Sequence, residues 1–386
     1  MKSKGNKVFL IFTLFYLYFT IAVFESSRGN FIPLYIEEFK INNTVISLIL
    51  SLNTLGNIIG SFLAGHFCEK YGHKTVYIIG SVTSTIAVLI APFTANLFML
   101  GLFNFIFGFG RSFVAIGVDS MVPVLSIGFE SILMNITHFM YGAGSFLGQR
   151  AYGNLLANSV PWRTIYLYLG IFFAVSVILT LVIKTPNVQV NSSNILKRKE
   201  LYKNPIIYMF VIALTFGLIS EAVIYTWFIS YMRNSYSLNP ADAASYASIY
   251  FLTFALGRLF GGFILNRTGN TKGLKLFLFM AALCILLGLK LKQEGLMLIA
   301  LSGFFTSITF PTMMVIINSV FKENSSFAIG FIVTISNILY VVLFNITGAL
   351  NDLLGTYAAF YASPASILSC LLMLHIITKK VNTVSL

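Results

Sequence analysis

Evenly apolar runs recur along almost the whole chain of 386 residues, and they constrain its fold more than any other feature. A helix needs about 20 such residues to cross the ~30 Å hydrocarbon core of a bilayer. Strands of a membrane barrel would instead show segments of about ten residues with alternating polarity. Charged residues make up 10% of the chain, against about 25% in soluble domains. The sequence therefore predicts an all-α membrane protein.

We expect twelve transmembrane helices in two pseudo-symmetric six-helix bundles. The expected spans are 8–36, 44–66, 75–94, 97–124, 132–157 and 163–184, then 205–232, 243–265, 273–292, 295–320, 327–350 and 356–378. One long polar stretch, at 185–204, separates the first six spans from the last six. The predicted domains are an N-terminal bundle at 1–184, a cytoplasmic linker at 185–204 and a C-terminal bundle at 205–386.

The net charge of +13 is unevenly distributed between the loops. Most Lys and Arg residues fall before the first span, in the linker and in loops that the helix order places on the same side. This positive-inside bias predicts that both termini are cytoplasmic and that the protein lies in the cell (cytoplasmic) membrane. The basic residues are then expected to contact anionic lipid, and no nucleic-acid partner is expected.

A glycine pattern at the end of the second span is repeated, at a constant offset, at the end of the eighth. Gly60, Gly65, Lys70 and Gly72 correspond to Gly257, Gly262, Arg267 and Gly269. Internal repeats of this kind are typical of transporters, whose substrate sites lie where the repeats meet.

The segment Gly65-His-Phe-Cys-Glu69-Lys70-Tyr-Gly72-His73-Lys74 resembles a loop of the major facilitator superfamily. That family carries Gly-x-x-x-Asp-Arg-x-Gly-Arg-Lys between its second and third helices. Glu69, Lys70 and His73 depart from the pattern but keep its acidic or basic character. Within the superfamily, the stretches 134–149, 257–263 and 303–314 resemble the fucose permease branch of sugar–proton symporters. The Arg that this branch carries near the outer end of the fourth helix is replaced by Leu102 and Phe103.

The resemblance implies a set of residues that control conformational switching. Gly65 is expected to let neighbouring helices approach closely, and Glu69 to meet a helix N-terminus or a cation. Asp119, near the cytoplasmic end of the fourth span, is expected to act as a gate or loop anchor. The candidate gating residues are Gly65, Glu69, Lys70, Gly72, Lys74, Asp119, Arg258 and Arg267.

Charged residues within the expected spans are candidates for function, because a charge inside a bilayer costs several kcal/mol. Glu25 and Arg28 lie one turn apart on the first helix and can pair. Helices 1, 4, 7 and 10 line the central cavity in the family that the chain resembles. This implies that Glu25, Arg28, Arg111 and Glu221 converge on one aqueous pocket. The proton-coupling candidates are Glu221, which has no basic partner nearby in sequence, and Glu25.

The substrate-binding candidates are Arg28, Arg111, Asn104, Tyr225, Trp227 and His138. Structural explanations stay open for several candidates. Glu25 and Arg28 can form a purely intrahelical pair, Glu221 can be bonded to a neighbouring Arg, and His138 can pack with a satisfied imidazole.

No GxxxxGK(S/T) phosphate loop is present, which disfavours transport driven by ATP. A carboxylate shielded from water can load and release a proton near neutral pH, so a proton is the expected coupling ion, with sodium left open. We expect secondary active transport of a small polar solute, a sugar or an organic anion. The alternative is proton-antiport efflux of drugs or a metabolite.

A membrane enzyme and a non-transporting receptor are the two other classes that a chain of this kind could belong to. The four His and three Cys residues are scattered, so no enzyme activity, metal site or cofactor is expected.

Overall fold

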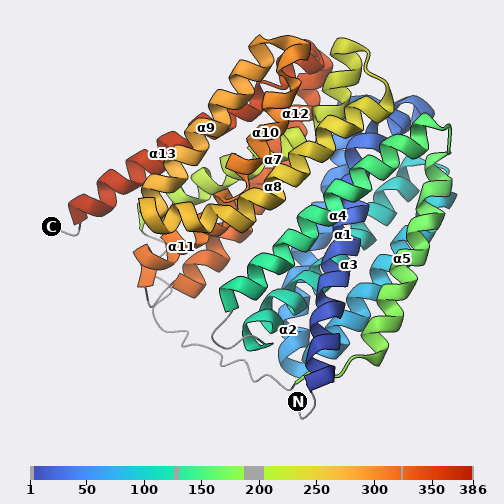
Figure 1. Cartoon of the computed structure of the whole chain (residues 1–386), viewed down its shortest axis with the longest axis horizontal. Helices are drawn as coiled ribbons and strands as arrows, with labels where there is room; N and C mark the ends of the chain where they lie inside the picture. The colour runs from blue at the N-terminus through green and yellow to red at the C-terminus, as the bar shows by residue number, and fades with distance from the viewer. Residues whose placement is uncertain (1–3, 126–129, 187–203, 323–324, 385–386) are drawn as a thin grey trace. The chain divides into compact units, whose positions relative to one another are not determined.

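The computed structural model describes residues 4–125, 130–186, 204–322 and 325–384, and their regular structure is entirely helical (Figure 1). The first helices are α1 (Lys4–Phe39), α2 (Asn43–Ile90), η1 (Ala91–Phe93), α3 (Leu97–Leu125), α4 (Glu130–Ala157) and α5 (Trp162–Val182). The later ones are α7 (Pro205–Tyr236), α8 (Pro240–Thr268), α9 (Asn270–Lys290), η2 (Lys292–Gly295), α10 (Leu296–Thr306), α11 (Thr309–Phe321), α12 (Ser325–Ala359) and α13 (Ala362–Val384). The predicted all-α class is confirmed.

Two helices run through positions where the sequence predicted a break or an end. α2 covers the expected spans 44–66 and 75–94, because its backbone turns at Gly72 alone, with φ 79° and ψ 165°. α12 continues past residue 350 and turns in the same way at Gly355, with φ 79° and ψ 156°. Glycine has no Cβ and adopts a positive φ readily, so a single residue serves as the connection. The expected span 295–320 is instead divided into α10 and α11.

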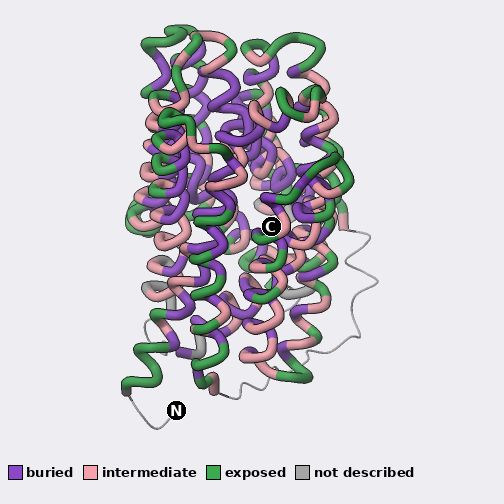
Figure 2. Tube along the Cα trace, turned by 90° about the vertical axis from the view of Figure 1, so that its right-hand side faces the viewer, coloured by how far each residue is buried: buried purple, intermediate pink, exposed green. Residues whose placement is uncertain are grey.

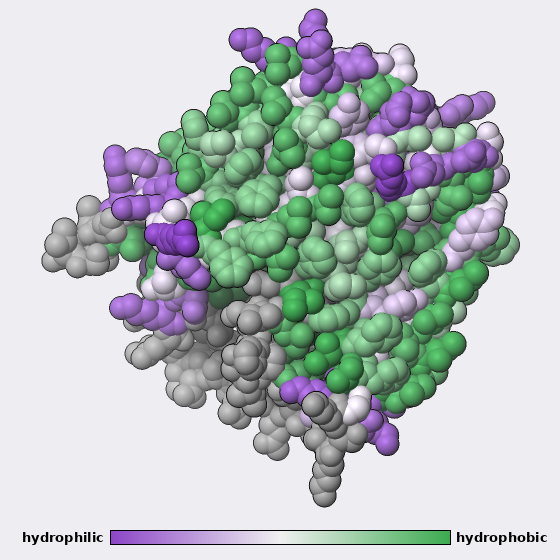
Figure 3. Space-filling model, viewed as in Figure 1, coloured by the Kyte–Doolittle hydropathy of each residue, from purple (hydrophilic) through white to green (hydrophobic). Residues whose placement is uncertain are grey.

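Ten helical segments among the described residues are long and apolar enough to cross a membrane. Asn43–Phe93 counts as one of the ten although it turns at Gly72. Large apolar side chains are exposed on these segments, including Phe62 at 83% and Phe263 at 69%. Figure 3 shows one face that is mostly hydrophobic, with hydrophilic side chains gathered toward its edges. Such a surface fits contact with lipid, and the chain is a multi-pass membrane protein.

The chain divides into two compact units, Met1–Asn191 with Leu238–Ser248, and Ser192–Ser237 with Ile249–Leu386. The buried residues lie on the inward sides of the helices, as the tube in Figure 2 shows. In the first unit, α2 packs along α3, and α1 packs along α4. The rings of Phe24 on α1 and Phe107 on α3 stack with their centroids 3.6 Å apart.

Glycines set how closely these helices approach. A Cβ on Gly108 of α3 would overlap the carbonyl oxygen of Asn53 on α2, and one on Gly144 of α4 would lie 2.5 Å from the carbonyl oxygen of Phe19 on α1. Small residues at such contacts let two backbones meet, which is how helices associate in membranes. The α2–α3 and α1–α4 contacts in turn position the polar residues described next.

Candidate functional site

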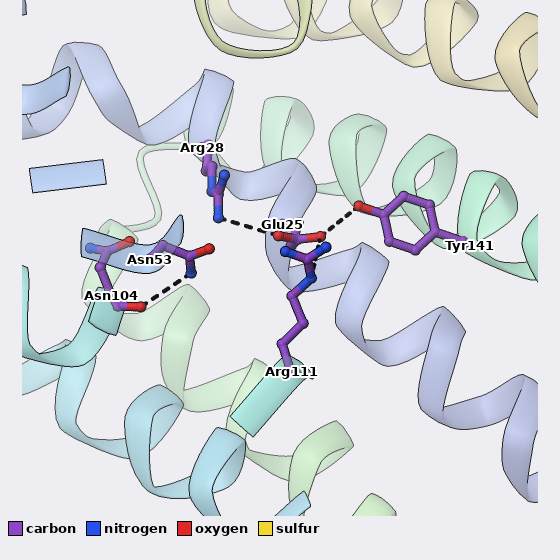
Figure 4. A network of polar contacts seen from close by, with 6 residues as sticks. All are labelled: Glu25, Arg28, Asn53, Asn104, Arg111 and Tyr141. Atoms are coloured by element: carbon purple, nitrogen blue, oxygen red, sulfur yellow. Dashed lines mark hydrogen bonds and ion pairs between the residues drawn. The ribbon is translucent and has the colours of Figure 1, made fainter. Parts of the chain in front are cut away.

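Glu25 lies at the centre of a group of polar side chains in the first unit (Figure 4). Arg28 on α1 donates from Nη2 to Glu25 Oε1 at 3.2 Å. Arg111 on α3 places Nε 3.4 Å from Glu25 Oε2, and Tyr141 on α4 donates from its hydroxyl to the same oxygen at 2.6 Å. We call these four residues the Glu25 cluster. It joins three helices through one carboxylate.

Glycine contacts position two of the helices that carry these side chains. Gly108 lies one turn before Arg111, and its contact with Asn53 brings α3 close to α2. Gly144 lies one turn after Tyr141, and its contact with α1 brings the Tyr141 hydroxyl within reach of Glu25. The small-residue pattern of α4 is therefore part of the site, since it sets the depth at which the tyrosine sits.

Burial and charge differ among the members of the cluster. The side chain of Glu25 is 4% exposed, whereas those of Arg28 and Arg111 are 16% and 30% exposed. Both carboxylate oxygens of Glu25 already accept a hydrogen bond or an ion pair. The Nε of Arg28 is buried and has no hydrogen-bond partner in the described structure. Within the four residues, two guanidinium groups thus contact one carboxyl group.

Asn104 lies beside the cluster, where α2 meets α3. Its side-chain Nδ2 donates within α3 to the backbone carbonyl oxygen of Leu100 at 2.8 Å, and its backbone carbonyl oxygen accepts from Asn53 Nδ2 of α2 at 3.1 Å. Both Asn side chains are buried (Figure 4). The bond from the Asn53 side chain joins α2 to α3 near the cluster, whereas the Asn104 side chain bonds to its own helix.

His138 and Asp119 gather around Tyr18 of α1. The Tyr18 hydroxyl donates to Asp119 Oδ1 at 2.5 Å, and the Tyr18 ring meets the His138 ring edge-on at 5.7 Å. The Tyr18 ring also lies 6.4 Å from that of Tyr141. Tyr141 therefore connects the Glu25 cluster to a second polar group that lies farther toward the N-terminus of α1.

In the second unit, Glu221 of α7 lies within electrostatic reach of Arg258 of α8. Arg258 donates from Nε to the carbonyl oxygen of Ser307 at 3.4 Å, and its guanidinium lies over the Phe254 ring at 4.7 Å. Arg258 belongs to a different helix from Glu221, so the sequence around Glu221 gave no sign of this basic neighbour. This placement agrees with the open alternative that Glu221 interacts with a neighbouring Arg.

The two aromatic candidates of α7 have different surroundings. The ring of Tyr225 meets Phe251 edge-on at 4.9 Å. Trp227 is 1% exposed and donates from Nε1 to Thr347 Oγ1 of α12 at 3.0 Å. The indole is thus surrounded by protein in this conformation, and its hydrogen bond serves the packing of α7 on α12.

Five of the candidate gating residues lie on α2 at or near the turn at Gly72: Gly65, Glu69, Lys70, Gly72 and Lys74. Lys74 donates from Nζ to the carbonyl oxygen of Leu181 at 2.7 Å, which ties the turn to α5. Lys70 lies over the Tyr71 ring at 5.2 Å, and Glu69 is exposed. Gly269, at the corresponding position of the second repeat, has φ 80°, and Arg267 before it is exposed. The repeated glycines therefore share a backbone conformation.

One expectation about this segment is not met. A Cβ on Gly65 would find nothing within 4 Å, so no helix approaches Gly65 closely in this conformation. Close contacts of α2 with α3 lie on either side of Gly65. Cβ atoms on Gly56, Gly60 and Gly80 would overlap the backbone of α3 or the side chains of Ser112 and Val114. A glycine pattern alone does not show which side of a helix faces a neighbour.

Tyr141 and Asn53 were missed by the sequence analysis. Tyr141 lies in the apolar, glycine-containing stretch 134–149, and its position one turn before Gly144 is the signal that could have identified it. Among the described residues, no group of three or more His, Cys, Asp or Glu side chains is placed to hold a metal ion. The site is built from arginine, carboxylate and hydroxyl groups, which bind polar solutes and move protons.

Known proteins resemble this chain over nearly its whole length. The sequence model of the Major Facilitator Superfamily matches residues 14–291 and 219–384. A TsgA protein homolog of Buchnera aphidicola subsp. Baizongia pistaciae is 21% identical over 371 residues, which cover 94% of either chain.

Two solved transporters share the fold. The nucleoside transporter NupG matches with a TM-score of 0.79 and 14% identity, over 95% of this chain and 99% of that one. The E. coli fucose:proton symporter FucP matches with a TM-score of 0.68 and 17% identity, over 96% of this chain and 99% of that one. The match to FucP agrees with the resemblance of stretches 134–149, 257–263 and 303–314 to the fucose permease branch.

Proposed function

The chain belongs to the Major Facilitator Superfamily, and from this premise we propose that it moves a small polar solute, a sugar or an organic anion, together with a proton. Transport of small solutes, and not enzymatic catalysis, is the activity of the family. The further proposal is that the cycle is secondary active transport by alternating access. The single observation that carries it is the Glu25 cluster, in which two arginines and a tyrosine surround a buried carboxylate on a membrane-spanning helix.

We propose that the helices cross the membrane twelve times, in two six-helix bundles at 1–184 and 205–386 with a cytoplasmic linker at 185–204. The turn at Gly72 supports counting α2 as two crossings. α4 is 28 residues long, which is enough for one further crossing of the membrane. α10 and α11 together form one crossing. The loop charges support cytoplasmic termini.

Arg28 and Arg111 are the proposed substrate-binding residues. An arginine offers several donors in a planar fork and binds carboxylates or vicinal hydroxyls in pairs of hydrogen bonds. Their side chains are more exposed than that of Glu25, so a solute can reach them first. His138, Asn104, Tyr225 and Trp227 remain proposed contributors, with Trp227 acting through helix position in this conformation.

Glu221 and Glu25 are the proposed proton-coupling residues. A solute that draws Arg28 or Arg111 away from Glu25 leaves its carboxylate without a cation, and proton uptake then becomes favourable. Glu221 interacts with Arg258, which can release it in the same manner. In both places, an arginine that changes partner couples solute binding to protonation.

The repeated turns are the proposed conformational switch. Gly72 and Gly269 hold the positive-φ turns, and Lys74 ties the first of them to α5. Glu69, Lys70, Asp119, Arg258, Arg267 and Gly65 are proposed to form and break contacts around these turns as the conformation changes.

Transport by the purified chain in liposomes tests the proposal. With an inside-alkaline pH gradient and a pH-sensitive dye in the lumen, we expect a transported solute to accumulate and to carry protons inward. Sodium gradients without a pH difference should drive no accumulation. Proton release from the lumen as the solute enters would indicate antiport, the export alternative. Solute flux that ignores the pH gradient would refute proton coupling.

A further inference from the structure

We propose that His73 is an acid-sensitive switch, which opens the contact between α2 and α3 beside the turn at Gly72 and slows the carrier when the cytoplasm acidifies. The slowing rests on the proposed transport function, whereas the opening of the contact does not. His73 is the first residue after that turn, where the family pattern carries an arginine. Its imidazole is only 1% exposed.

The contacts of His73 hold one end of α3 to α2. Nε2 of the imidazole and Oγ of Ser120 on α3 form a hydrogen bond of 3.0 Å. One turn earlier on α3, the carbonyl oxygen of Gly117 accepts from the Tyr77 hydroxyl at 2.8 Å. A Cβ on Gly117 would lie 2.7 Å from the Tyr77 ring, so the two helices touch through a glycine here. His73 is therefore enclosed between closely packed helices.

The surroundings of His73 favour a neutral imidazole. Cys68 and Val76 belong to one cluster of buried side chains, and Tyr77 belongs to a second. Among the described residues, no acidic side chain forms an ion pair with His73. A charge in such a place is costly unless a partner offsets it, so a protonated His73 is expected to leave the contact for water.

The other titratable and charged groups around the turn have contacts of their own or face water. Asp119 of α3 accepts from the Tyr18 hydroxyl of α1, and the ring of His138 on α4 lies against that of Tyr18. Lys74 donates to the carbonyl oxygen of Leu181 on α5. The exposed groups are His66, Glu69 and Lys70 of α2, and Lys184 after α5. A histidine is the side chain that ordinarily changes charge between neutral and mildly acidic pH, and of these histidines His73 joins α2 to α3.

The direction of the pH dependence follows from the preference for a neutral ring. In the opened contact, His73 would have the pKa of a histidine in water, about 6.5. The closed contact is therefore fully favoured above about pH 6.5 and loses stability as the pH falls below that value. At about pH 5.5, about ten of eleven exposed imidazoles are protonated, so opening becomes up to about tenfold more favourable than at neutral pH.

Opening the contact would act on transport through the turn. The turn at Gly72 is tied to α5 through Lys74 and to α3 through His73. Since this turn is part of the proposed conformational switch, the loss of one tie is expected to slow the change of conformation. A proton-driven importer would thereby be restrained when its own activity, or the surroundings, had made the cytoplasm acidic.

The native thiol of Cys68 can report the opening, because it is 5% exposed and is hydrogen-bonded to the Ser120 side chain. The full chain in detergent is treated with a dipyridyl disulfide, which reacts with thiols in acid, and the labelled cysteines are identified by mass spectrometry. Labelling of Cys68 relative to Cys370, which is buried in the second unit, should rise about five- to tenfold between about pH 7.5 and about pH 5.5. An unchanged ratio would overturn the proposal.

Three variants assign the response to His73. His73→Gln keeps a neutral group that can bond to Ser120, and should abolish the rise. His73→Arg introduces the permanently charged residue of the family pattern, and should give at neutral pH the labelling that the unaltered protein shows in acid. His66→Gln replaces an exposed histidine of the same helix and is the matched control, which should keep the full rise. A rise that persists in His73→Gln, or one that is lost in His66→Gln, would refute the assignment.

If the His73 variants fail to fold, the unaltered protein still decides. The chain has four histidines, and one imidazole signal in its NMR spectrum should titrate at least one pH unit below about 6.5. Four signals that all titrate at or above that value would overturn the proposal.

The effect on transport is measured as exchange of radiolabelled fucose and lactate across liposomes with the same pH on both sides. Exchange should slow severalfold more in acid for the unaltered protein than for His73→Gln. Equal slowing of the two proteins, with Cys68 opening as expected, would refute the restraint on the carrier. Absence of proton-driven solute uptake would refute the proposed function, and Cys68 labelling would still show whether the switch exists.

Discussion

Replacing Gly148 by Ala tests the idea that close packing of α4 on α1 builds the Glu25 cluster. A Cβ at this position would lie 2.5 Å from Ser26 Oγ and 3.1 Å from both Cα and the carbonyl oxygen of Val23. Non-bonded carbon atoms prefer separations of about 3.5–4.0 Å, so the two helices must move apart by roughly 0.5 Å. Val23 cannot yield easily, because its carbonyl oxygen accepts from Ser26 Oγ at 2.8 Å and from the Tyr152 hydroxyl at 2.6 Å.

The expected cost follows from two opposing terms. Overpacking a well-filled contact destabilises a protein by about 1–3 kcal/mol. Exchange of a helical glycine for alanine stabilises the folded protein by roughly 0.5–1 kcal/mol, because the unfolded chain loses less conformational entropy on folding. We therefore expect a net loss of about 1–2 kcal/mol from Gly148→Ala. The Tyr141–Glu25 hydrogen bond of 2.6 Å should also lengthen, and solute uptake should slow.

Gly65→Ala is the matched control. It carries the same change of composition on a helix of the same unit, but its Cβ would meet nothing within 4 Å. The apparent Tm in detergent, measured at one fixed scan rate, should fall by a few degrees for Gly148→Ala and stay level or rise for Gly65→Ala. Equal Tm values with unchanged uptake would refute the packing argument. A lower Tm for Gly65→Ala alone would show that the relevant helix contact lies at Gly65.

Three further predictions concern coupling, binding and switching. Glu221→Gln should abolish accumulation driven by a pH gradient while solute exchange across liposomes persists; unchanged accumulation at every pH would exclude Glu221 as a proton carrier. Tyr141→Phe should weaken solute binding severalfold with little change in fold, because it removes the hydroxyl that donates a hydrogen bond to Glu25 but keeps the ring. Calorimetric titration would measure the affinity, and an unaltered affinity would contradict a role of the Glu25 cluster in solute binding. Gly72→Ala should destabilise the chain by about 1–2 kcal/mol, since φ is 79° there, and slow turnover more than it changes affinity. Uptake kinetics would separate these effects, and a large loss of affinity at normal turnover would contradict the assignment.

The fold class and the approximate helix positions could be predicted from the amino-acid sequence alone. Length and apolarity of a segment are local properties, and in a bilayer they suffice, because a spanning segment must satisfy its own backbone hydrogen bonds. The loop motif at Gly65–Lys74 likewise predicted the family. Boundaries were less certain at Gly72 and Gly355, where one glycine replaces an expected loop.

Which polar residues meet depends on how the helices pack, and the sequence does not show this. Glu25 and Arg28 are neighbours on one helix, so their pairing could be predicted from spacing. Arg111 and Tyr141 come from other helices, and whether they reach Glu25 depends on how closely and at what rotation those helices pack. The same holds for Arg258 and Glu221. Spacing along a chain shows which face of a helix a side chain occupies, but the neighbour of that face depends on how the helices pack, for which Gly144, one turn from Tyr141, is an example.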